Sequence, residues 1–158
     1  MKTLDIQNTF MEVSAIENGT AIDHLPPSSL FKVIRLLKLE NVPNQITFGT
    51  NLDSKRMGKK AIIKITDKYC EDNEINYLAL VAPKARISII KNYEVVEKRL
   101  IEAPESVEGI VRCANPMCIT NHEPIPTSFA VLQGQGELML RCRYCEKITH
   151  QEQIEIIK

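Results

Sequence analysis

The 158-residue sequence lacks the features that mark several large classes of protein. Its twenty Lys and Arg residues equal its twenty Asp and Glu residues, so it has no strongly basic charge of the kind that nucleic-acid-binding proteins carry. No run approaches the roughly 20 apolar residues that a helix needs to cross a bilayer. The polar stretch 1–8 lacks the apolar centre of a secretory signal. We therefore expect a cytoplasmic protein without membrane or nucleic-acid partners.

Catalytic signatures are missing as well. The sequence contains no P-loop, no nucleophile elbow and no paired-carboxylate pattern. Asp23 and His24 are adjacent, but a catalytic dyad would also need a nucleophile within reach. A hydrogen-bonded pair in a loop is the simpler interpretation of these two residues. We expect a protein that binds rather than catalyses.

Cysteines are present in a pattern that predicts a metal site. Two close pairs are separated by twenty-three residues: Cys113 with Cys118, and Cys142 with Cys145. Four thiolates at this spacing form a closed tetrahedral structural zinc site, without an open position for catalysis. Disulfides are not expected in a cytoplasmic chain. A redox pair of thioredoxin type would need a strand and a helix N-terminus that the surroundings do not offer.

The remaining candidates for metal chemistry have simpler roles. Because four cysteines suffice for one Zn²⁺ per chain, His122 and His150 are expected to lie on the surface or next to the ligands. Cys70 is about forty residues from the others, and we interpret it as an inert small residue.

The first two thirds of the chain predict an α+β domain. The expected elements, in chain order, are a strand at 11–16, a helix at 28–40, strands at 45–52 and 60–66, a helix from about 72 to 82, and a strand or bent pair at 86–90 and 93–96. Residues 20–27 are expected to be irregular. The order β-α-β-β-α-β is that of the ferredoxin-like sandwich, in which both helices cover one face of a four-stranded antiparallel sheet.

A smaller all-β domain of zinc-ribbon type is predicted to follow. We expect domains at 1–100 and 107–158, joined by a linker at 101–106 that contains Pro104. Hairpin strands are expected at 129–132 and 137–141, and a closing strand at 153–157. So small a core is marginal, and a structural zinc site contributes about 10–16 kcal/mol toward folding it.

The charge of the second domain indicates its type of partner. Residues 107–158 carry five basic and six acidic residues, and four thiolates around Zn²⁺ make the domain more acidic. A docking surface for another protein is therefore favoured. A zinc-ribbon nucleic-acid-binding protein is the alternative, and it would show steep salt dependence.

Lys60 and Lys64 lie four residues apart, which places them on the same side of a strand. A solvated strand face is the simpler interpretation. The functional interpretation is a phosphate site, to which Lys98 would add a third cation. The spacing alone leaves both open.

Several motifs resemble one known family over nearly the whole chain. They are Gly-Thr-Ala-Ile-Asp-His-Leu-Pro at 19–26, Asn-Tyr-Glu-Val-Val at 92–96, Glu-Pro-Ile at 123–125, Ser-Phe-Ala-Val at 128–131 and Cys-Arg-Tyr-Cys-Glu-Lys at 142–147. Together with the cysteine spacing, they closely resemble the regulatory chain of aspartate carbamoyltransferase.

The resemblance implies a non-catalytic subunit. In that family the N-terminal domain binds ATP as activator and CTP, with UTP, as inhibitor. The zinc domain docks onto the catalytic chains, and the holoenzyme joins two catalytic trimers with three regulatory-chain homodimers. The implied role is feedback control of pyrimidine biosynthesis.

The resemblance also implies a set of nucleotide-binding residues. Ser88 stands where well-known members have Asn, and Ala21 stands where they have Val. Serine can hydrogen-bond but reaches less far than asparagine, so the relative strength of ATP and CTP binding does not follow from the resemblance. The implied residues are Val13, Ala15, Ile16, Ala21, Asp23, His24, Lys60, Lys64, Ser88, Ile90, Tyr93, Val95 and Lys98.

Overall fold

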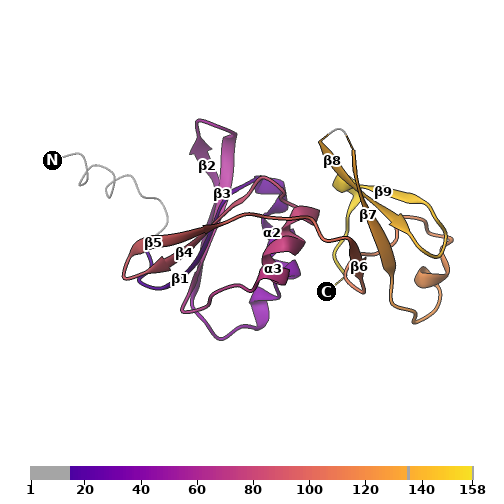
Figure 1. The fold of residues 1–158 in the computed structure, drawn as a ribbon, viewed down its shortest axis with the longest axis horizontal. Helices are drawn as coiled ribbons and strands as arrows, with labels where there is room; N and C mark the ends of the chain where they lie inside the picture. Colours follow the sequence, from indigo (N-terminus) through magenta and orange to yellow (C-terminus); the bar gives the residue numbers. More distant parts are fainter. Residues whose placement is uncertain (1–14, 135, 158) are drawn as a thin grey trace. The chain divides into compact units, whose positions relative to one another are not determined.

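The computed structural model describes residues 15–134 and 136–157. Within them the chain forms two antiparallel sheets and a few short helices, so the predicted α+β class is confirmed (Figure 1). The contacts between residues divide the chain into two compact units. The first comprises the described residues up to Leu30, Pro43–Cys70 and Ala85–Leu100, and the second comprises Phe31–Val42, Glu71–Lys84 and the described residues from Ile101 on.

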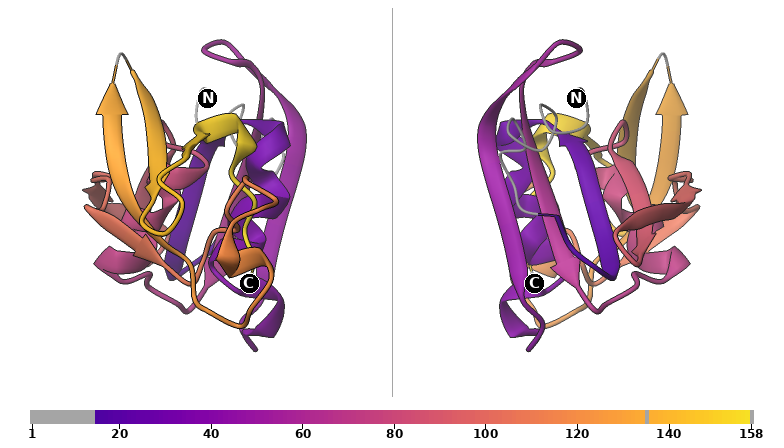
Figure 2. Two further views of the ribbon diagram at one scale, coloured as in Figure 1. Left: turned by 90° about the vertical axis from the view of Figure 1, so that its right-hand side faces the viewer. Right: turned by 90° about the vertical axis from the view of Figure 1, so that its left-hand side faces the viewer.

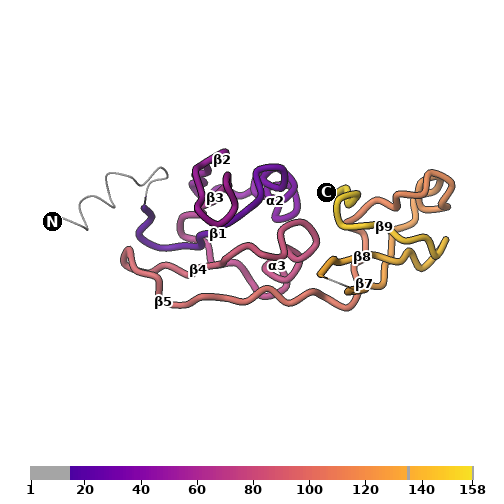
Figure 3. The backbone as a smooth tube through the Cα atoms, turned by 90° about the horizontal axis from the view of Figure 1, so that it is seen from above, coloured from indigo at the N-terminus to yellow at the C-terminus, as the bar shows by residue number. Residues whose placement is uncertain are grey.

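The first unit is built on a five-stranded sheet in the order β2-β3-β1-β4-β5. Every neighbouring pair is antiparallel. The first four strands have the predicted ferredoxin-like order, and the fifth is added because residues 86–99 form a hairpin, whose two strands run side by side in Figure 3. The strands are β1 Gly19–Leu25, β2 Ile46–Ser54, β3 Gly58–Thr66, β4 Arg86–Lys91 and β5 Glu94–Arg99.

The prediction that residues 20–27 are irregular was wrong, and the two described residues of the strand predicted at 11–16 are not in a strand. Residues 11–14 lie outside the described residues, and Ala15 and Ile16 precede β1, which occupies the segment expected to be irregular. The polar residues of this segment concealed the strand. Thr20 is fully buried, but its hydroxyl donates to the Lys68 carbonyl oxygen over 2.7 Å, so its burial leaves no unpaired donor.

Both predicted helices are present but short. Leu30–Leu36 forms α2, and Lys38 ends it by adopting a left-handed φ of 56°, after which only a 3₁₀ turn follows at Leu39–Asn41. Helix α3 covers Asp72–Tyr77 and continues as the 3₁₀ turn η3 at Leu78–Leu80. Further 3₁₀ turns lie at Pro27–Ser29, Ile119–Asn121 and Gln151–Gln153. No helix among the described residues is long and apolar enough to cross a membrane.

The second unit contains a four-stranded sheet in the order β6-β7-β8-β9. The predicted hairpin is confirmed as β7 Ser128–Gly134 and β8 Glu137–Cys142, drawn in orange in Figure 2. The outer strands are β6 Ser106–Glu108 and β9 Ile148–His150.

The closing strand expected at 153–157 does not form. A reciprocal pair of hydrogen bonds between His150 and Gln153 caps the 3₁₀ turn at Gln151–Gln153, which directly follows β9. Ile154 and Ile156 are still buried, and a single bridge joins Ile156 to Val111. The apolar pattern of this segment therefore indicated burial correctly and strand geometry incorrectly.

Gly19 provides a test of the register of β1. Its φ is 145°, and a Cβ added there would lie 1.9 Å from the Ile65 carbonyl oxygen. Gly58 is a matched control, since its φ is also positive, at 81°, but a Cβ there would meet nothing within 4 Å.

We predict that Gly19→Ala lowers the free energy of unfolding of the first unit by at least about 2 kcal/mol, and Gly58→Ala by about 1 kcal/mol. Urea titration followed by amide exchange of Ile22 and Ile63 would measure both. Equal losses in the two variants would contradict the close approach of Gly19 to β3.

Candidate functional site

The four predicted metal ligands come together in the second unit. Their Sγ atoms all lie within 4.8 Å of one another. Cys113 and Cys118 are in the loop after β6, Cys142 ends β8, and Cys145 is in the turn before β9. The Sγ distances are 3.6 Å from Cys113 to Cys145 and 3.7 Å from Cys118 to Cys142.

These distances fit a tetrahedral metal ion and exclude disulfides. A Zn–S bond of about 2.3 Å gives a tetrahedron with edges of about 3.8 Å, whereas sulfurs joined in a disulfide are about 2.05 Å apart. Cys113, Cys118 and Cys142 are buried, and Cys145 is partly exposed. The arrangement is thus closed to solvent on most sides, as in a structural site.

The turn after Cys142 is shaped around its sulfur. The Tyr144 N–H donates to Cys142 Sγ over 3.4 Å, and the Glu146 N–H donates to the Cys142 carbonyl oxygen over 2.8 Å. Glu146 adopts a left-handed φ of 67°, which lets Lys147 return to accept the Cys142 N–H over 3.0 Å. Amide donors aimed at a sulfur favour its thiolate form.

Two asparagines hold the loop that carries the other cysteine pair. Asn121 Nδ2 donates to the carbonyl oxygens of Cys113 and Asn115, over 3.1 and 2.8 Å. The Asn115 carbonyl oxygen also accepts the Cys118 N–H over 3.0 Å. Such outer contacts orient the ligands, and the sequence analysis missed them because asparagines in a loop give no distinctive signal.

The histidines near the cluster have other contacts. His122 Nε2 lies 2.9 Å from the Pro116 carbonyl oxygen, and His150 Nδ1 lies 3.4 Å from Glu137 Oε2. The metal-binding cluster in the described residues is formed by the four cysteines.

Protonation of the thiols opposes metal binding at two of the ligands. Burial raises the pKa of Cys113 to about 12 and also raises the pKa of Cys142. Burial acts in the same direction on Cys145, but hydrogen bonds from the Asn115 side chain and the Lys147 backbone outweigh it and lower that pKa to about 7. A metal ion must therefore displace protons, and its double positive charge provides the driving force.

The first unit carries a second candidate site on one face of its sheet. Cross-strand partners in an antiparallel sheet lie on the same face. Lys64 is opposite Ala21, Ala21 is opposite Ser88, and Ser88 is opposite Lys98, so one row crosses β3, β1, β4 and β5. The two-residue period along each strand adds Asp23, Lys60 and Ile90 to this face. The other face carries the buried residues Ile22, Ile63, Ile65, Ile87 and Ile89.

An ion pair lies at one end of this face. Lys60 Nζ is 3.0 Å from Asp23 Oδ1, and the His24 N–H donates to the same oxygen over 2.6 Å. His24 has a left-handed φ of 61°, at an irregularity in the pairing of β1 with β3. Its Nδ1 atom is buried without a hydrogen-bond partner among the described residues. A ligand that offers a donor or acceptor here would satisfy that nitrogen.

The side chain of Lys64 is nearly buried. It is 9% exposed, and burial lowers the pKa of its ammonium group while the charge of Asp23 raises it. A buried cation is stabilised by an anion close to it. Lys98, by contrast, is exposed at the other end of the row.

The apolar residues of the predicted set divide into buried and exposed groups. Ile16, Ala21 and Ile90 form one buried cluster. Val95 is opposite Ile90 and 51% exposed, and Tyr93 is 66% exposed. Ala15 is exposed, and Val13 lies outside the described residues.

Thr47 is a residue of this face that the sequence analysis missed. It lies opposite Lys64 in the β2–β3 hairpin and extends the row by one strand. Only the register of the hairpin reveals it, because a threonine in a strand is unremarkable in the sequence.

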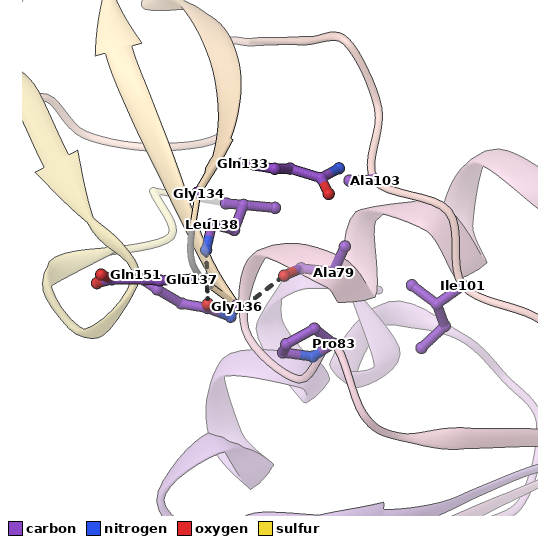
Figure 4. Close-up of a pocket in the computed structure, with 10 residues that line it drawn as sticks. All are labelled: Ala79, Pro83, Ile101, Ala103, Gln133, Gly134, Gly136, Glu137, Leu138 and Gln151. Atoms are coloured by element: carbon purple, nitrogen blue, oxygen red, sulfur yellow. Dashed lines mark hydrogen bonds between the residues drawn. The ribbon is translucent and has the colours of Figure 1, made fainter.

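A small cavity in the second unit is bridged by one side chain (Figure 4). Its volume is about 210 Å³, below the roughly 300–1,000 Å³ of ligand pockets, so it is better interpreted as a gap in packing. Gln151 donates its side-chain amide to the Ala79 carbonyl oxygen and accepts the Leu138 N–H, both over 3.3 Å. This bridge joins η3 to β8.

Two models of known protein families match the chain, one over the segment with the sheet face and one over the segment with the four cysteines. Residues 11–102 match the family model for the allosteric domain of the aspartate carbamoyltransferase regulatory chain, and residues 105–155 match the model for its metal-binding domain.

Curated relatives match over nearly their full length. The chain is 50% identical over 147 residues to the aspartate carbamoyltransferase regulatory chain of Bacteroides thetaiotaomicron, which covers 93% of this chain and 95% of the relative. The corresponding protein of Porphyromonas gingivalis is 50% identical, with 93% and 97% covered. That of Pyrococcus abyssi is 44% identical over 146 residues, with 91% and 95% covered. The chain thus belongs to the family of aspartate carbamoyltransferase regulatory chains, the non-catalytic subunits of that enzyme.

Proposed function

We propose that the chain binds ATP as an activator and CTP and UTP as feedback inhibitors, and transmits their binding to the catalytic chains of aspartate carbamoyltransferase. The observation that carries this proposal is the row on the sheet face, where Lys64 and Lys98 flank Ala21 and Ser88. The alternative, a nucleic-acid-binding zinc ribbon, gains no support from the acidic balance of residues 107–158.

The charges on this face suit a nucleotide triphosphate. Such a ligand carries about four negative charges near neutral pH, and Lys60, Lys64 and Lys98 offer three cations to it. Because Lys64 is nearly buried, water would screen its attraction to a phosphate beside it less than at an exposed position. The apolar cluster of Ile16, Ala21 and Ile90 offers a surface to the base. The polar group at Asp23 and His24 is available to the sugar or base.

The metal that we assign to the four cysteines is one structural Zn²⁺ per chain. Four thiolates in tetrahedral arrangement are the ligand set that Zn²⁺ prefers, and no position is left for water or substrate. Zinc bound by free thiols, rather than disulfides, fits a reducing cytoplasm.

Exposed apolar side chains and outer sheet strands support the proposed contacts with the catalytic chain and with a second regulatory chain. Around the cysteines, Met117, Ile119, Tyr144 and Ile148 are between 38% and 79% exposed, and we assign them to docking on the catalytic chain. Among the described residues, β2 and β5 are the outer strands of the five-stranded sheet, and an open edge can pair with a second regulatory chain. We propose three such dimers with two catalytic trimers.

Regulation requires that a nucleotide bind unequally to two states of the enzyme, with a typical coupling of about 1–3 kcal/mol. The 3₁₀ turn η3 is a candidate for transmission. It precedes β4, which carries Ser88 and Ile90, and its Ala79 carbonyl oxygen accepts the Gln151 amide. A movement of β4 would act on η3 through the few residues that join them. The hydrogen bond from Gln151 to Ala79 would then pass the movement to the 3₁₀ turn after β9.

The division into domains at 1–100 and 107–158, with a linker at 101–106, remains a proposal. The two family models meet near residues 102–105, which supports it. The compact units differ from it, because α2 and α3 are grouped with the residues from Ile101 on.

We predict that Lys64→Ala weakens the binding of CTP and ATP together, by about tenfold or more, because a charge-assisted contact to phosphate is lost. Lys60→Ala should change the ratio of the two affinities, since Lys60 lies beside Asp23 rather than in the row. Calorimetric titration of the zinc-loaded chain measures both.

Lys59→Ala is the control for these variants. Lys59 is on the same strand but pairs with Asp53 over 2.7 Å at an exposed position, so its removal should leave nucleotide affinity unchanged. Unchanged affinities in both Lys60→Ala and Lys64→Ala would remove the proposed site.

We also predict that a zinc chelator abolishes amide protection at Phe129, Leu140 and Thr149 and leaves Ile22, Ile63 and Ile87 protected. The reason is that the core around the cysteines is too small to remain folded without its metal. Hydrogen exchange with and without chelator measures this, and added Zn²⁺ should restore protection. Equal loss in both sets would contradict separate domains, and no loss would contradict a structural metal.

A further inference from the structure

The turn between β4 and β5 holds a tyrosine in an unfavourable backbone conformation. Lys91 pairs with Glu94, so Asn92 and Tyr93 form a two-residue hairpin turn. Their φ angles are 53° and 67°, both in the left-handed region, as in a type I′ turn. The second position of this turn normally holds glycine, because a side chain there is strained. Something must therefore hold Tyr93 in place.

Burial of the ring does not hold it, because Tyr93 is 66% exposed. The turn is instead fastened by its backbone to the segment before β1. The Tyr93 N–H donates to the Glu17 carbonyl oxygen over 2.9 Å. The Asn92 N–H donates to Asn18 Oδ1 over 3.2 Å.

Asn18 is itself anchored to the sheet. Its carbonyl oxygen accepts the Asp67 N–H over 2.8 Å, just after the end of β3. The side chain of Asn18 thus connects the β4–β5 turn to the end of β3. An alanine at this position would keep the backbone bond to Asp67 and lose the bond to Asn92.

The clamped turn borders the apolar part of the proposed nucleotide site. Ile16, next to Glu17, clusters with Ala21 and Ile90, and Val95 lies opposite Ile90. An exposed aromatic ring at this border can be covered by a nucleoside. Strain that is kept at such a position serves to preset a binding group before the ligand arrives.

We infer that Asn18 is a positioning residue, which holds the Asn92–Tyr93 turn in its left-handed form and so presets Tyr93 for contact with the base or sugar of the nucleotide. This inference rests on the proposed function. It assigns Asn18 to the nucleoside part of the ligand, whereas the lysine row serves the phosphates.

The test compares Asn18→Ala with Asn18→Asp in the zinc-loaded chain. Asn18→Ala should raise the exchange rate of the Asn92 amide and weaken the binding of cytidine and adenosine, each by about three- to tenfold, because one hydrogen bond no longer holds the competent turn. Asn18→Asp retains an acceptor and should restore both. Inorganic tripolyphosphate should bind the unchanged chain and Asn18→Ala equally. Neutral nucleosides are used so that the charge of the aspartate does not repel the ligand.

Asn73→Ala is the matched control, because the Asn73 side chain accepts from its sequence neighbour Glu74 in α3. It should change neither readout. Unchanged exchange of Asn92 in Asn18→Ala would overturn the clamp. Faster exchange with unchanged nucleoside affinity would overturn its role in binding. A wild-type chain that binds neither CTP nor ATP would overturn the proposed function and with it the role of Asn18 in binding, while the exchange measurement would still report on the clamp.

Discussion

Four cysteine sulfurs cannot stay within 4.8 Å of one another as thiolates unless a cation lies among them. This constraint shapes the C-terminal part of the chain. The hairpin β7–β8 brings Cys142 to the cluster. The turn after it carries Cys145 and is closed by the left-handed Glu146, and Asn121 holds the loop that carries Cys113 and Cys118. The sheet of this module is small, and in the proposed function its fold depends on the metal as well as on its buried apolar residues.

The N-terminal sheet is organised by a different constraint, the register of its antiparallel strands. That register places Lys64, Ala21, Ser88 and Lys98 in one row, although they are far apart in the sequence. The buried isoleucines occupy the opposite face, so the row lies on the face turned away from them. In the proposed function, a phosphate of the nucleotide lies beside the nearly buried charge of Lys64, and the exposed ring of Tyr93 contacts the nucleoside.

The sequence predicted the metal site well because ligand chemistry depends on residue type and spacing, both of which can be counted. The predicted fold class is also confirmed, and so are the hairpins β2–β3 and β7–β8. Both were predictable because alternating apolar residues mark strands such as 60–66. Strand β1 was not predicted, because Thr20, Asp23 and His24 interrupt the apolar pattern of a central strand. Thr20 is acceptable in this buried position because its hydroxyl donates to the Lys68 carbonyl oxygen. Thr47 and Asn18 escaped prediction because register and tertiary hydrogen bonds decide their neighbours.

We propose a connection between the nucleotide site and the catalytic chains through the metal-binding domain. Its most direct test is to mix the purified chain with catalytic trimers of aspartate carbamoyltransferase and to measure the mass of the product by sedimentation, with Zn²⁺ and with a chelator. We expect a complex of two trimers with three dimers in the presence of Zn²⁺, and separate trimers and regulatory chains after chelation. A complex that forms equally well in both conditions, or in neither, would contradict this connection.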